Sequence, residues 1–291
     1  MSKHRIVILG NGMVGNRFIE EILKKECRNK YTITVFCEEK NTAYDRVSLS
    51  SYFDGKTKEE LSLVPKGYYK DNGIEVFIGE RAASIDIKSK MVKSSEGREI
   101  YYDTLVFATG SYPFVPPIQG SKQFYFDGYQ AFKCGDHKEF VHVYRTIDDL
   151  DNIKISANQS KIGVVLGGGL LGLECANALK NLGLKTHVVD RGPTLMGVQI
   201  DAQAGDVLRN KIEQLGVEVH TNKNTKKISP GKGARYKLQF DDGTSLETDM
   251  LVFSVGIRPR DEVAGESGLI IGEKGGIVIN NECRTSEYNI F

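Results

Sequence analysis

The order of apolar and polar segments repeats in two halves of the chain. In the first half, an apolar strand pattern at residues 5–9 is followed by a glycine turn, a helix with one apolar face at 17–25, and a second apolar strand at 32–37. In the second half, a strand at 162–166, a glycine turn, a helix at 170–182 and a strand ending at Asp190 follow in the same order. Each half therefore begins with the βαβ unit of a parallel sheet.

The segments after each βαβ start repeat as well. Gly-Ile-Glu-Val at residues 73–76 matches Gly-Val-Glu-Val at 216–219, and Leu-Val-Phe at 105–107 matches Leu-Val-Phe at 251–253. Short alternating segments and turn signals before each Leu-Val-Phe predict an antiparallel meander. We therefore expect the α/β class with two Rossmann-like nucleotide-binding domains, each a three-layer arrangement of parallel sheet plus antiparallel meander, the second inserted in the first.

The domain bounds follow from the spacing of these segments. Three prolines in residues 111–120 predict an extended crossover, and residues 144–153 predict a helix capped by Thr146 or Asp148. Residues 277–279 predict a strand. The sequence then stops at residue 291 while entering a further strand pattern, so the chain is expected to be cut off rather than finished. The predicted ranges are 1–120 for the first domain, 121–146 for a link, 147–272 for the second domain and 273–291 for a return to the first. Residues 123–140 receive no role.

Each half carries the pattern Gly-x-Gly-x-x-Gly between its first strand and its helix. The first glycine permits a tight turn, the second lets the backbone approach a pyrophosphate, and the third lets helix and strand pack closely. The open N–H groups of the helix start then face the phosphates. The glycines are Gly10, Gly12 and Gly15 in the first half, and Gly167, Gly169 and Gly172 in the second. In this strand–turn–helix setting, the pattern predicts dinucleotide binding.

An acidic residue at the end of the second strand completes each unit. Asp190 follows Gly167 by 23 residues, where a carboxylate can accept hydrogen bonds from both ribose hydroxyls. An aspartate repels a 2′-phosphate, so NAD is favoured over NADP, a preference that the neighbouring Arg191 moderates. In the first half, Glu38 is the expected ribose carboxylate and Glu39 the alternative.

Composition excludes several classes of partner. The net charge is +1 with no long run of one sign, which predicts no nucleic-acid and no membrane partner. The longest apolar run, residues 162–173, is too short to span a bilayer. The first residues enter a strand directly, leaving no room for a targeting peptide. Five scattered cysteines indicate free thiols in a reducing compartment, so we expect a cytoplasmic protein.

The cysteine and histidine spacings predict neither disulfide chemistry nor a metal site. No Cys-x-x-Cys or Cys-x-x-x-x-Cys occurs in the sequence, which argues against thiol–disulfide exchange. His187 and His220 lie within strand patterns and are expected to be structural. Cys134, Asp136, His137 and His142 crowd together but match no zinc pattern, so we interpret them as a polar loop.

The two dinucleotide patterns, with Ala-Thr-Gly after the first and Gly-Ile-Arg-Pro after the second, resemble the pyridine nucleotide–disulfide oxidoreductase superfamily. Within it, the segments AYDRVSLSSYF, YRTIDDL and SYPFVPPI resemble the N-terminal part of the large subunit of NAD(P)H-dependent nitrite reductases. The resemblance implies FAD in the first domain, NAD(H) in the second, and hydride transfer from NADH to FAD. Iron–sulfur and sirohaem centres that reduce nitrite to ammonia would lie beyond residue 291 or involve a small subunit.

The same resemblance assigns roles to individual residues. Glu174 would lie near the junction of nicotinamide and flavin and Arg46 beside the flavin, as the two catalytic candidates. Without the resemblance, they read as an ordinary helix glutamate and a turn arginine. The residues implied for FAD are Gly10, Gly12, Met13, Val14, Gly15, Glu38, Arg46, Ala108, Thr109 and Gly110. Those implied for NAD(H) are Gly167, Gly169, Leu170, Leu171, Gly172, Glu174, Asp190 and Gly256.

Two other functions remain open from the sequence. A stand-alone NADH:ferredoxin or rubredoxin reductase, or an NADH oxidase, would use the same two domains. A non-catalytic NADH-sensing module is the alternative from another class, although it would need only one nucleotide site. Relatives continue past residue 291 into a turn that contacts FAD, so retention of FAD by this chain is open, as is assembly into a homodimer.

Overall fold

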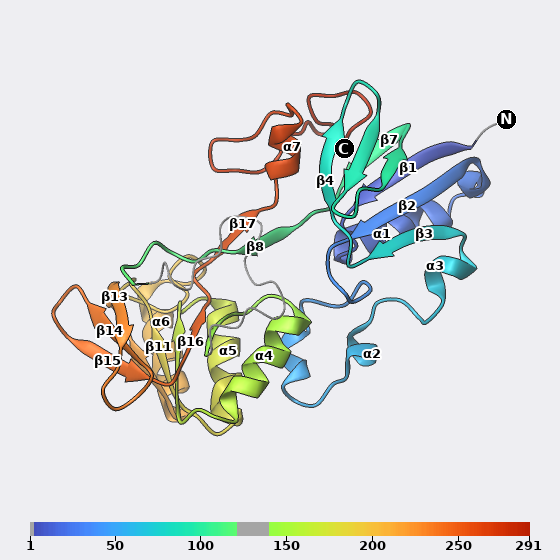
Figure 1. The fold of residues 1–291 in the computed structure, drawn as a ribbon. Helices are drawn as coiled ribbons and strands as arrows, with labels where there is room; N and C mark the ends of the chain where they lie inside the picture. The colour runs from blue at the N-terminus through green and yellow to red at the C-terminus, as the bar shows by residue number, and fades with distance from the viewer. Residues whose placement is uncertain (1–2, 121–139) are drawn as a thin grey trace. The chain divides into compact units, whose positions relative to one another are not determined.

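The computed structural model describes residues 3–120 and 140–291, which form two compact units, each with its own parallel sheet (Figure 1). Because unit 1 is interrupted by unit 2, the second domain is inserted in the first, as the sequence predicts. Residues 49–55 come from the first half of the chain but belong to unit 2, an exchange that no pattern suggested. Unit 1 comprises Met1–Ser48, Lys56–Tyr112 and Arg258–Phe291, and unit 2 comprises Leu49–Gly55 and Pro113–Ile257.

Unit 1 is built on a four-stranded parallel sheet in the order β3-β2-β1-β7. Its strands are β1 (His4–Leu9), β2 (Tyr31–Cys37), β3 (Ile74–Ile78) and β7 (Thr104–Phe107). An antiparallel meander of β4 (Ala82–Asp86), β5 (Met91–Ser94) and β6 (Glu99–Tyr101) forms a separate sheet. The helical segments are α1 (Met13–Leu23), η1 (Glu26–Lys30), α2 (Lys58–Leu61), α3 (Tyr68–Asp71) and α7 (Glu262–Glu266).

The alternation of side chains along β1 gives unit 1 its three layers. Ile6 and Ile8 pack with Ile19 of α1 on one face of the sheet. Val7 and Leu9 point to the other face, and their cluster includes residues of the meander. The strand is therefore buried on both sides, which explains its unbroken apolar sequence.

Unit 2 repeats this plan with the sheet order β12-β11-β10-β16-β9. The strands are β9 (Val141–Val143), β10 (Ile162–Leu166), β11 (Lys185–Val189), β12 (Val217–His220) and β16 (Met250–Phe253). The meander consists of β13 (Thr225–Pro230), β14 (Tyr236–Phe240) and β15 (Ser245–Thr248), and its residues share a core with one face of the sheet. The helices are α4 (Ile147–Ala157), α5 (Leu170–Asn181) and α6 (Ala202–Gln214), with η2 (Leu49–Tyr52) contacting α5.

Two short strands lie in segments for which the sequence predicts an extended crossover or a link. β9 lies within residues assigned to the link, yet it pairs in parallel with β16 as an edge strand of unit 2. Where the chain runs between the units, β8 (Ser111–Pro113) pairs with β17 (Ile257–Pro259). The domain bounds expected from the sequence stay a prediction.

The start of α4 decides between the two predicted caps. Thr146 is the N-cap: its side chain accepts a hydrogen bond from the Asp149 N–H, and the Asp149 carboxylate accepts from the Thr146 N–H, completing a capping box. The alternative, Asp148, lies inside the first turn.

The strand predicted at residues 277–279 is wrong. Only an isolated bridge between Ile271 and Ile277 is present there. Gly275 and Gly276, with φ of 84° and 88°, turn the chain back on itself just before this segment. Val278 and Ile279 are exposed, so their apolar sequence does not mark a buried strand.

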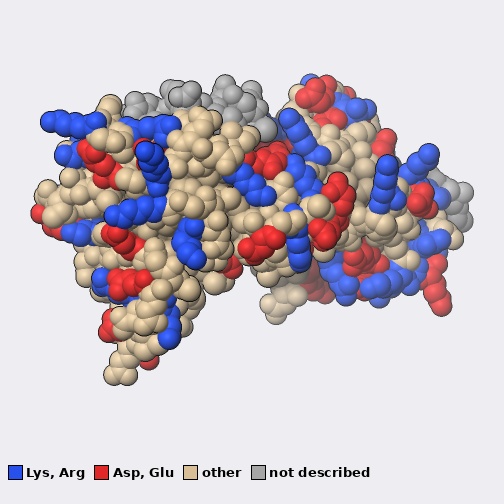
Figure 2. Space-filling model, turned by 90° about the horizontal axis from the view of Figure 1, so that it is seen from below, with Lys and Arg blue, Asp and Glu red and all other residues tan. Residues whose placement is uncertain are grey.

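The surface and the helix lengths bear on the expected partners. Acidic and basic side chains are interspersed over the face shown in Figure 2, in keeping with the net charge of +1. The longest described helix, α6, has 13 residues, and none of the described helices has the length and apolarity needed to cross a bilayer.

Most of the stretch 123–140, including Cys134, Asp136 and His137, lies outside the described residues. His142, the fourth residue of the segment interpreted as a polar loop, is instead buried in β9 and hydrogen-bonded to the Ser156 hydroxyl.

Candidate functional site

The glycine turn of unit 1 contains two kinds of glycine. Gly10 has φ of +113°, and a Cβ there would lie 2.1 Å from the Ala108 carbonyl oxygen. A Cβ on Gly15 would lie 2.3 Å from the Gly10 carbonyl oxygen. Around Gly12, in contrast, a Cβ would meet no described atom within 4 Å. Packing within the unit therefore requires the first and third glycines but not the second.

The turn of unit 2 repeats this arrangement closely. A Cβ on Gly167, which has φ of +111°, would lie 2.2 Å from the Ser254 carbonyl oxygen, and one on Gly172 would lie 2.0 Å from the Gly167 carbonyl oxygen. The second glycine, Gly169, again has no described atom within 4 Å of a Cβ position. In both turns, the second glycine faces space that a ligand can enter.

The helices that follow these turns begin without a side-chain cap. Gly12 is the N-cap of α1 and Gly169 the N-cap of α5, so no described side chain accepts from the first N–H groups of either helix. Val14 and Leu170, in the first turns, are 72% and 57% exposed. Met13 and Leu171 beside them are partly buried. Free N–H groups at an accessible helix start suit an anion such as a pyrophosphate.

Asp190 is fixed against the turn of unit 2 by backbone hydrogen bonds. One carboxylate oxygen accepts from the Gly168 N–H at 2.5 Å, and the other accepts from the Gly192 N–H at 2.6 Å. Each carboxylate oxygen has a second lone pair, so the group can still accept from ribose hydroxyls. The neighbouring Arg191, which is expected to moderate the preference for NAD over NADP, is exposed.

Both acids after β2 in unit 1 are paired with arginines. Glu38 accepts from the Arg260 guanidinium. Glu39 accepts from Arg46 and, at 2.7 Å, from the Tyr44 hydroxyl, and the Arg46 guanidinium lies 4.8 Å from the centre of the Tyr44 ring. Arg46 is therefore held by two neighbours on its own segment. The Glu38 side chain remains 38% exposed and accessible to a ligand.

Arg260 is attached to the end of β7 through its backbone. Its N–H donates to the Gly110 carbonyl at 3.0 Å, and its carbonyl accepts from the Thr109 hydroxyl at 2.7 Å. Burial lowers the pKa of its guanidinium. This arginine links Glu38 to Thr109 and Gly110, three of the residues implied for FAD.

The glycines that follow β7 and β16 also resemble each other in conformation and surroundings. Gly110 after β7 has φ of +70° and Gly256 after β16 has φ of +115°. Both conformations favour glycine over any L residue. No described atom lies within 4 Å of a Cβ at either position, so both are open to a ligand.

Glu174 lies partly buried on α5, and burial raises the pKa of its carboxyl group. The Tyr144 hydroxyl is buried and has no hydrogen-bond partner among the described residues. The pKa of Tyr144 is raised, first by burial and then by the nearby Cys175 and Glu174. Its ring is stacked on Phe53, with centroids 6.2 Å apart. Because Arg46 belongs to unit 1 and Glu174 to unit 2, a shared catalytic role of the two stays a prediction.

The buried cysteines are poor nucleophiles. Burial raises the pKa of Cys37 to about 11 and raises that of Cys175 as well, so both thiols are protonated near neutral pH. Neither is paired with another cysteine, and the described part of the chain contains no disulfide. These sites do not supply a thiolate.

Sequence reasoning missed Arg260, Gly168 and Tyr144. Arg260 directly follows the Gly-Ile-Arg-Pro segment, but 222 residues separate it from Glu38, and the sequence carries no signal of that pairing. Gly168 occupies the first of the three unspecified positions in its glycine pattern, although its N–H donates to Asp190. Tyr144 begins the YRTIDDL segment and could have been singled out from that resemblance.

Two glycine turns, each opening an uncapped helix and each followed by an acidic residue after the next strand, define a protein with two dinucleotide-binding folds. The family model described as pyridine nucleotide-disulphide oxidoreductase matches residues 4–291. The chain belongs to this family, as its sequence patterns indicate.

Two relatives show which members of the family this chain is similar to. The chain is 53% identical over 292 residues to the nitrite reductase (NADH) large subunit of Escherichia coli K12, covering 100% of this chain and 33% of that one. It is 49% identical to the nitrite reductase [NAD(P)H] large subunit of Klebsiella oxytoca, covering 100% of this chain and 29% of the relative. The chain thus spans about a third of these relatives.

Among solved structures, an NAD-dependent persulfide reductase from A. fulgidus has a TM-score of 0.86 and 28% sequence identity. The match covers 99% of this chain and 52% of that one. This likeness extends over both units and supports the fold class expected from the sequence.

Proposed function

We propose that the chain is the reductase module of an NAD(P)H-dependent nitrite reductase, with FAD held by unit 1 and NADH by unit 2. The repeated turn carries the proposal: in each unit two glycines are required by packing, while the second faces open space at an uncapped helix start. A pyrophosphate requires such a backbone approach. The identity to two nitrite reductase large subunits supports the choice among the functions of the family.

In unit 1, the residues present fit FAD. The N–H groups of α1 from Met13 onward would bind the pyrophosphate, with Gly12 allowing close approach. Glu38 would accept from the adenosine ribose, and Arg260 would hold that carboxylate in place. Arg46, anchored by Glu39, would lie beside the flavin, and Gly110 would leave room at the end of β7.

In unit 2, the same elements fit NADH. The start of α5, including Leu170 and Leu171, would bind the second pyrophosphate, and Gly256 would leave room at the end of β16. Asp190, already fixed by two backbone N–H groups, would accept from the ribose hydroxyls and repel a 2′-phosphate. We therefore propose NADH rather than NADPH as the donor.

The redox chemistry belongs to the bound groups, and the chain positions them. FAD, when bound, supplies a hydride acceptor for NADH and a route by which electrons leave one at a time. Glu174, whose pKa is raised by burial, would line the nicotinamide side together with the Tyr144 hydroxyl, which has no hydrogen-bond partner in the described part of the chain. Iron–sulfur and sirohaem centres in the rest of a longer protein, or with a small subunit, would receive the electrons in the cytoplasm.

An absorption spectrum followed by anaerobic titration with NADH and NADPH tests the proposal. We expect the purified chain, supplied with FAD, to show a flavin band that bleaches with a small excess of NADH and needs much more NADPH. The Gly169→Ala variant should keep the flavin band and require at least about tenfold more NADH, because the added methyl group occupies the pyrophosphate approach.

Three results would contradict this proposal. A chain that binds no FAD even when extended beyond residue 291 would remove the reductase function and favour an NADH-sensing module. Preferential bleaching by NADPH would remove the role proposed for Asp190. If thiol reagents abolished turnover while the flavin still bleached, a cysteine-based reaction would replace electron transfer to a separate centre.

A further inference from the structure

Two histidines and a glutamate, which the sequence treats as separate strand residues, converge at the edge of the sheet in unit 2. His187 lies on β11, and Glu218 and His220 lie on β12, the edge strand of the sheet. The register pairs His187 with Glu218 and Val189 with His220. Partners in parallel strands share a face, and so do residues two apart, so all three side chains project from the same face.

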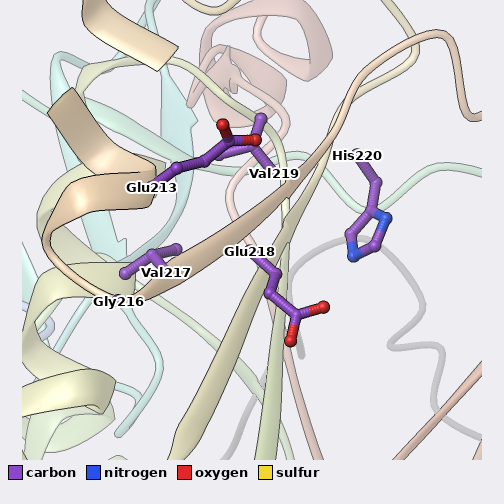
Figure 3. A pocket seen from close by; sticks show the side chains of 6 residues that line it. All are labelled: Glu213, Gly216, Val217, Glu218, Val219 and His220. Carbon is purple, nitrogen blue, oxygen red and sulfur yellow. The ribbon is translucent and has the colours of Figure 1, made fainter. Parts of the chain in front are cut away.

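The close-up of this edge shows the arrangement on β12. The side chains of Glu218 and His220 leave one side of the strand, while that of Val219 leaves the other (Figure 3). A hollow of about 470 Å³ runs along this strand, so the edge is accessible from outside. It is lined by Glu213, Gly216, Val217, Glu218, Val219 and His220.

The three side chains point their polar atoms at one another. His187 Nδ1 lies 3.0 Å from His220 Nε2 and 3.3 Å from a carboxylate oxygen of Glu218. One ligand atom from each residue falls within 4.8 Å of the others. Two nitrogens bound to one tetrahedral zinc ion at ~2.1 Å lie roughly 3.4 Å apart, so small side-chain shifts would bring all three atoms to one ion.

The chemistry of these side chains suits a metal ion. Each imidazole has a ring nitrogen that can offer a lone pair, and the Glu218 carboxylate offers an oxygen. The other oxygen of Glu218 lies 3.0 Å from the Lys185 ammonium group, which holds the carboxylate with its first oxygen turned toward the histidines. Two imidazoles and one carboxylate form a zinc ligand set that leaves one coordination position open.

We propose that His187, Glu218 and His220 bind a zinc ion at the edge of the second sheet. None of its ligands is among the residues proposed above for FAD or NADH. The site joins β11 to β12 close to Asp190, the residue that follows β11. The Asp190 N–H donates to the His220 carbonyl oxygen at 2.9 Å. A bound ion would therefore fix the backbone that positions the Asp190 carboxylate.

Titration with Zn²⁺ against a chromophoric chelator tests the site, on the 291-residue chain with its thiols alkylated so that cysteines do not bind the metal. We expect one zinc ion per chain. His220→Gln and Glu218→Gln, both at positions that are not fully buried, should each lower the zinc affinity by about tenfold or more. Zinc should also raise the thermal unfolding midpoint of the unsubstituted chain and not that of His220→Gln.

Two matched controls separate a built site from general surface binding. His4→Gln removes an exposed histidine of unit 1, and Glu213→Gln removes a carboxylate that lines the same hollow but lies on α6. Both should bind zinc as the unsubstituted chain does. The proposal is overturned if the unsubstituted chain binds no zinc, or if His220→Gln and Glu218→Gln bind it as tightly as the two controls; the histidines then form only a hydrogen-bonded pair.

Discussion

A single methyl group distinguishes two kinds of glycine within each turn. In unit 1, Gly15→Ala would place a Cβ 2.3 Å from the Gly10 carbonyl oxygen, so helix and strand must separate. We expect this overpacking to lower the free energy of unfolding by roughly 1–3 kcal/mol. Gly12→Ala adds the same methyl group to open space with φ of −85°, and should change that free energy by less than about 0.5 kcal/mol.

The two variants should behave oppositely when FAD is added. Urea unfolding without ligand measures the packing cost, and FAD titration measures the binding cost. Gly12→Ala should remain stable but bind FAD more weakly, because its methyl group meets the ligand. An unchanged FAD affinity in Gly12→Ala would mean that the pyrophosphate does not approach this glycine.

Asp190 should determine nucleotide choice through a carboxylate that the backbone has already oriented. Asp190→Ser removes the negative charge and the two hydrogen bonds from Gly168 and Gly192. We expect NADH to bind at least about tenfold more weakly and NADPH to bind no worse, since the repulsion of the 2′-phosphate is lost. Anaerobic titration of Asp190→Ser with both nucleotides measures this, with Asp242→Ser as the control. Equal losses for NADH and NADPH would show a structural role only.

At the scale of elements, the same kind of carboxylate contact joins two neighbouring strands in the sheet of each unit. Asp103, just before β7, accepts from the Arg5 backbone N–H at 2.8 Å and from its guanidinium at 2.9 Å. Asp249, just before β16, accepts from the N–H groups of Lys161 and Ile162. In each unit, a carboxylate therefore ties the strand after the meander to the strand that leads into the glycine turn.

This tie predicts a pH dependence of stability. The hydrogen bonds from Arg5 lower the pKa of Asp103 to about 2. A carboxyl group with a lowered folded-state pKa stabilises the fold fully above its unfolded pKa of about 3.9, and the contribution is lost as the pH falls toward 2. Asp103→Asn should therefore flatten the decline of urea stability between about pH 4 and pH 2. The pair is partly exposed, so the expected effect is about 1 kcal/mol or less.

Asp206→Asn, at an exposed position on α6, is the matched control. It should leave the pH profile unchanged, because Asp206 lies away from the strand junctions. Equal profiles for Asp103→Asn and the unsubstituted chain would show that solvent screening removes the contribution of the Arg5 pair.

The elements could be predicted wherever burial imposed a period on the sequence. The strand at residues 162–166 has its predicted bounds, because strands buried on both faces have largely apolar sequences. Asp190 follows β11 directly, as the sequence predicts. At residues 277–279 the same signal failed, since the segment is exposed and follows two glycines in a left-handed conformation. Apolar composition alone does not distinguish the two cases.

Contacts between distant residues could not be predicted in the same way. The pairing of Glu38 with Arg260 and the convergence of His187, Glu218 and His220 depend on which strands become neighbours and in what register. A one-residue change of register would move Glu218 and His220 to the other face of β12. Local patterns set the period of each strand but not this register.

On the scale of the whole molecule, each unit buries its own apolar clusters and carries its own glycine turn. Calorimetry of the chain with FAD and NADH tests whether this division is also functional. A ligand at 100 times its dissociation constant stabilises its folded unit by about 2.7 kcal/mol, a shift of roughly 5–10 °C for a domain of about 150 residues. We expect FAD to raise one unfolding transition and NADH another, with Gly12→Ala abolishing the first shift and Gly169→Ala the second. The opposite result would be a single unfolding transition whose midpoint both ligands raise, with either variant abolishing both shifts. It would contradict separate sites, because each open glycine would then affect binding of a ligand that its own unit does not hold.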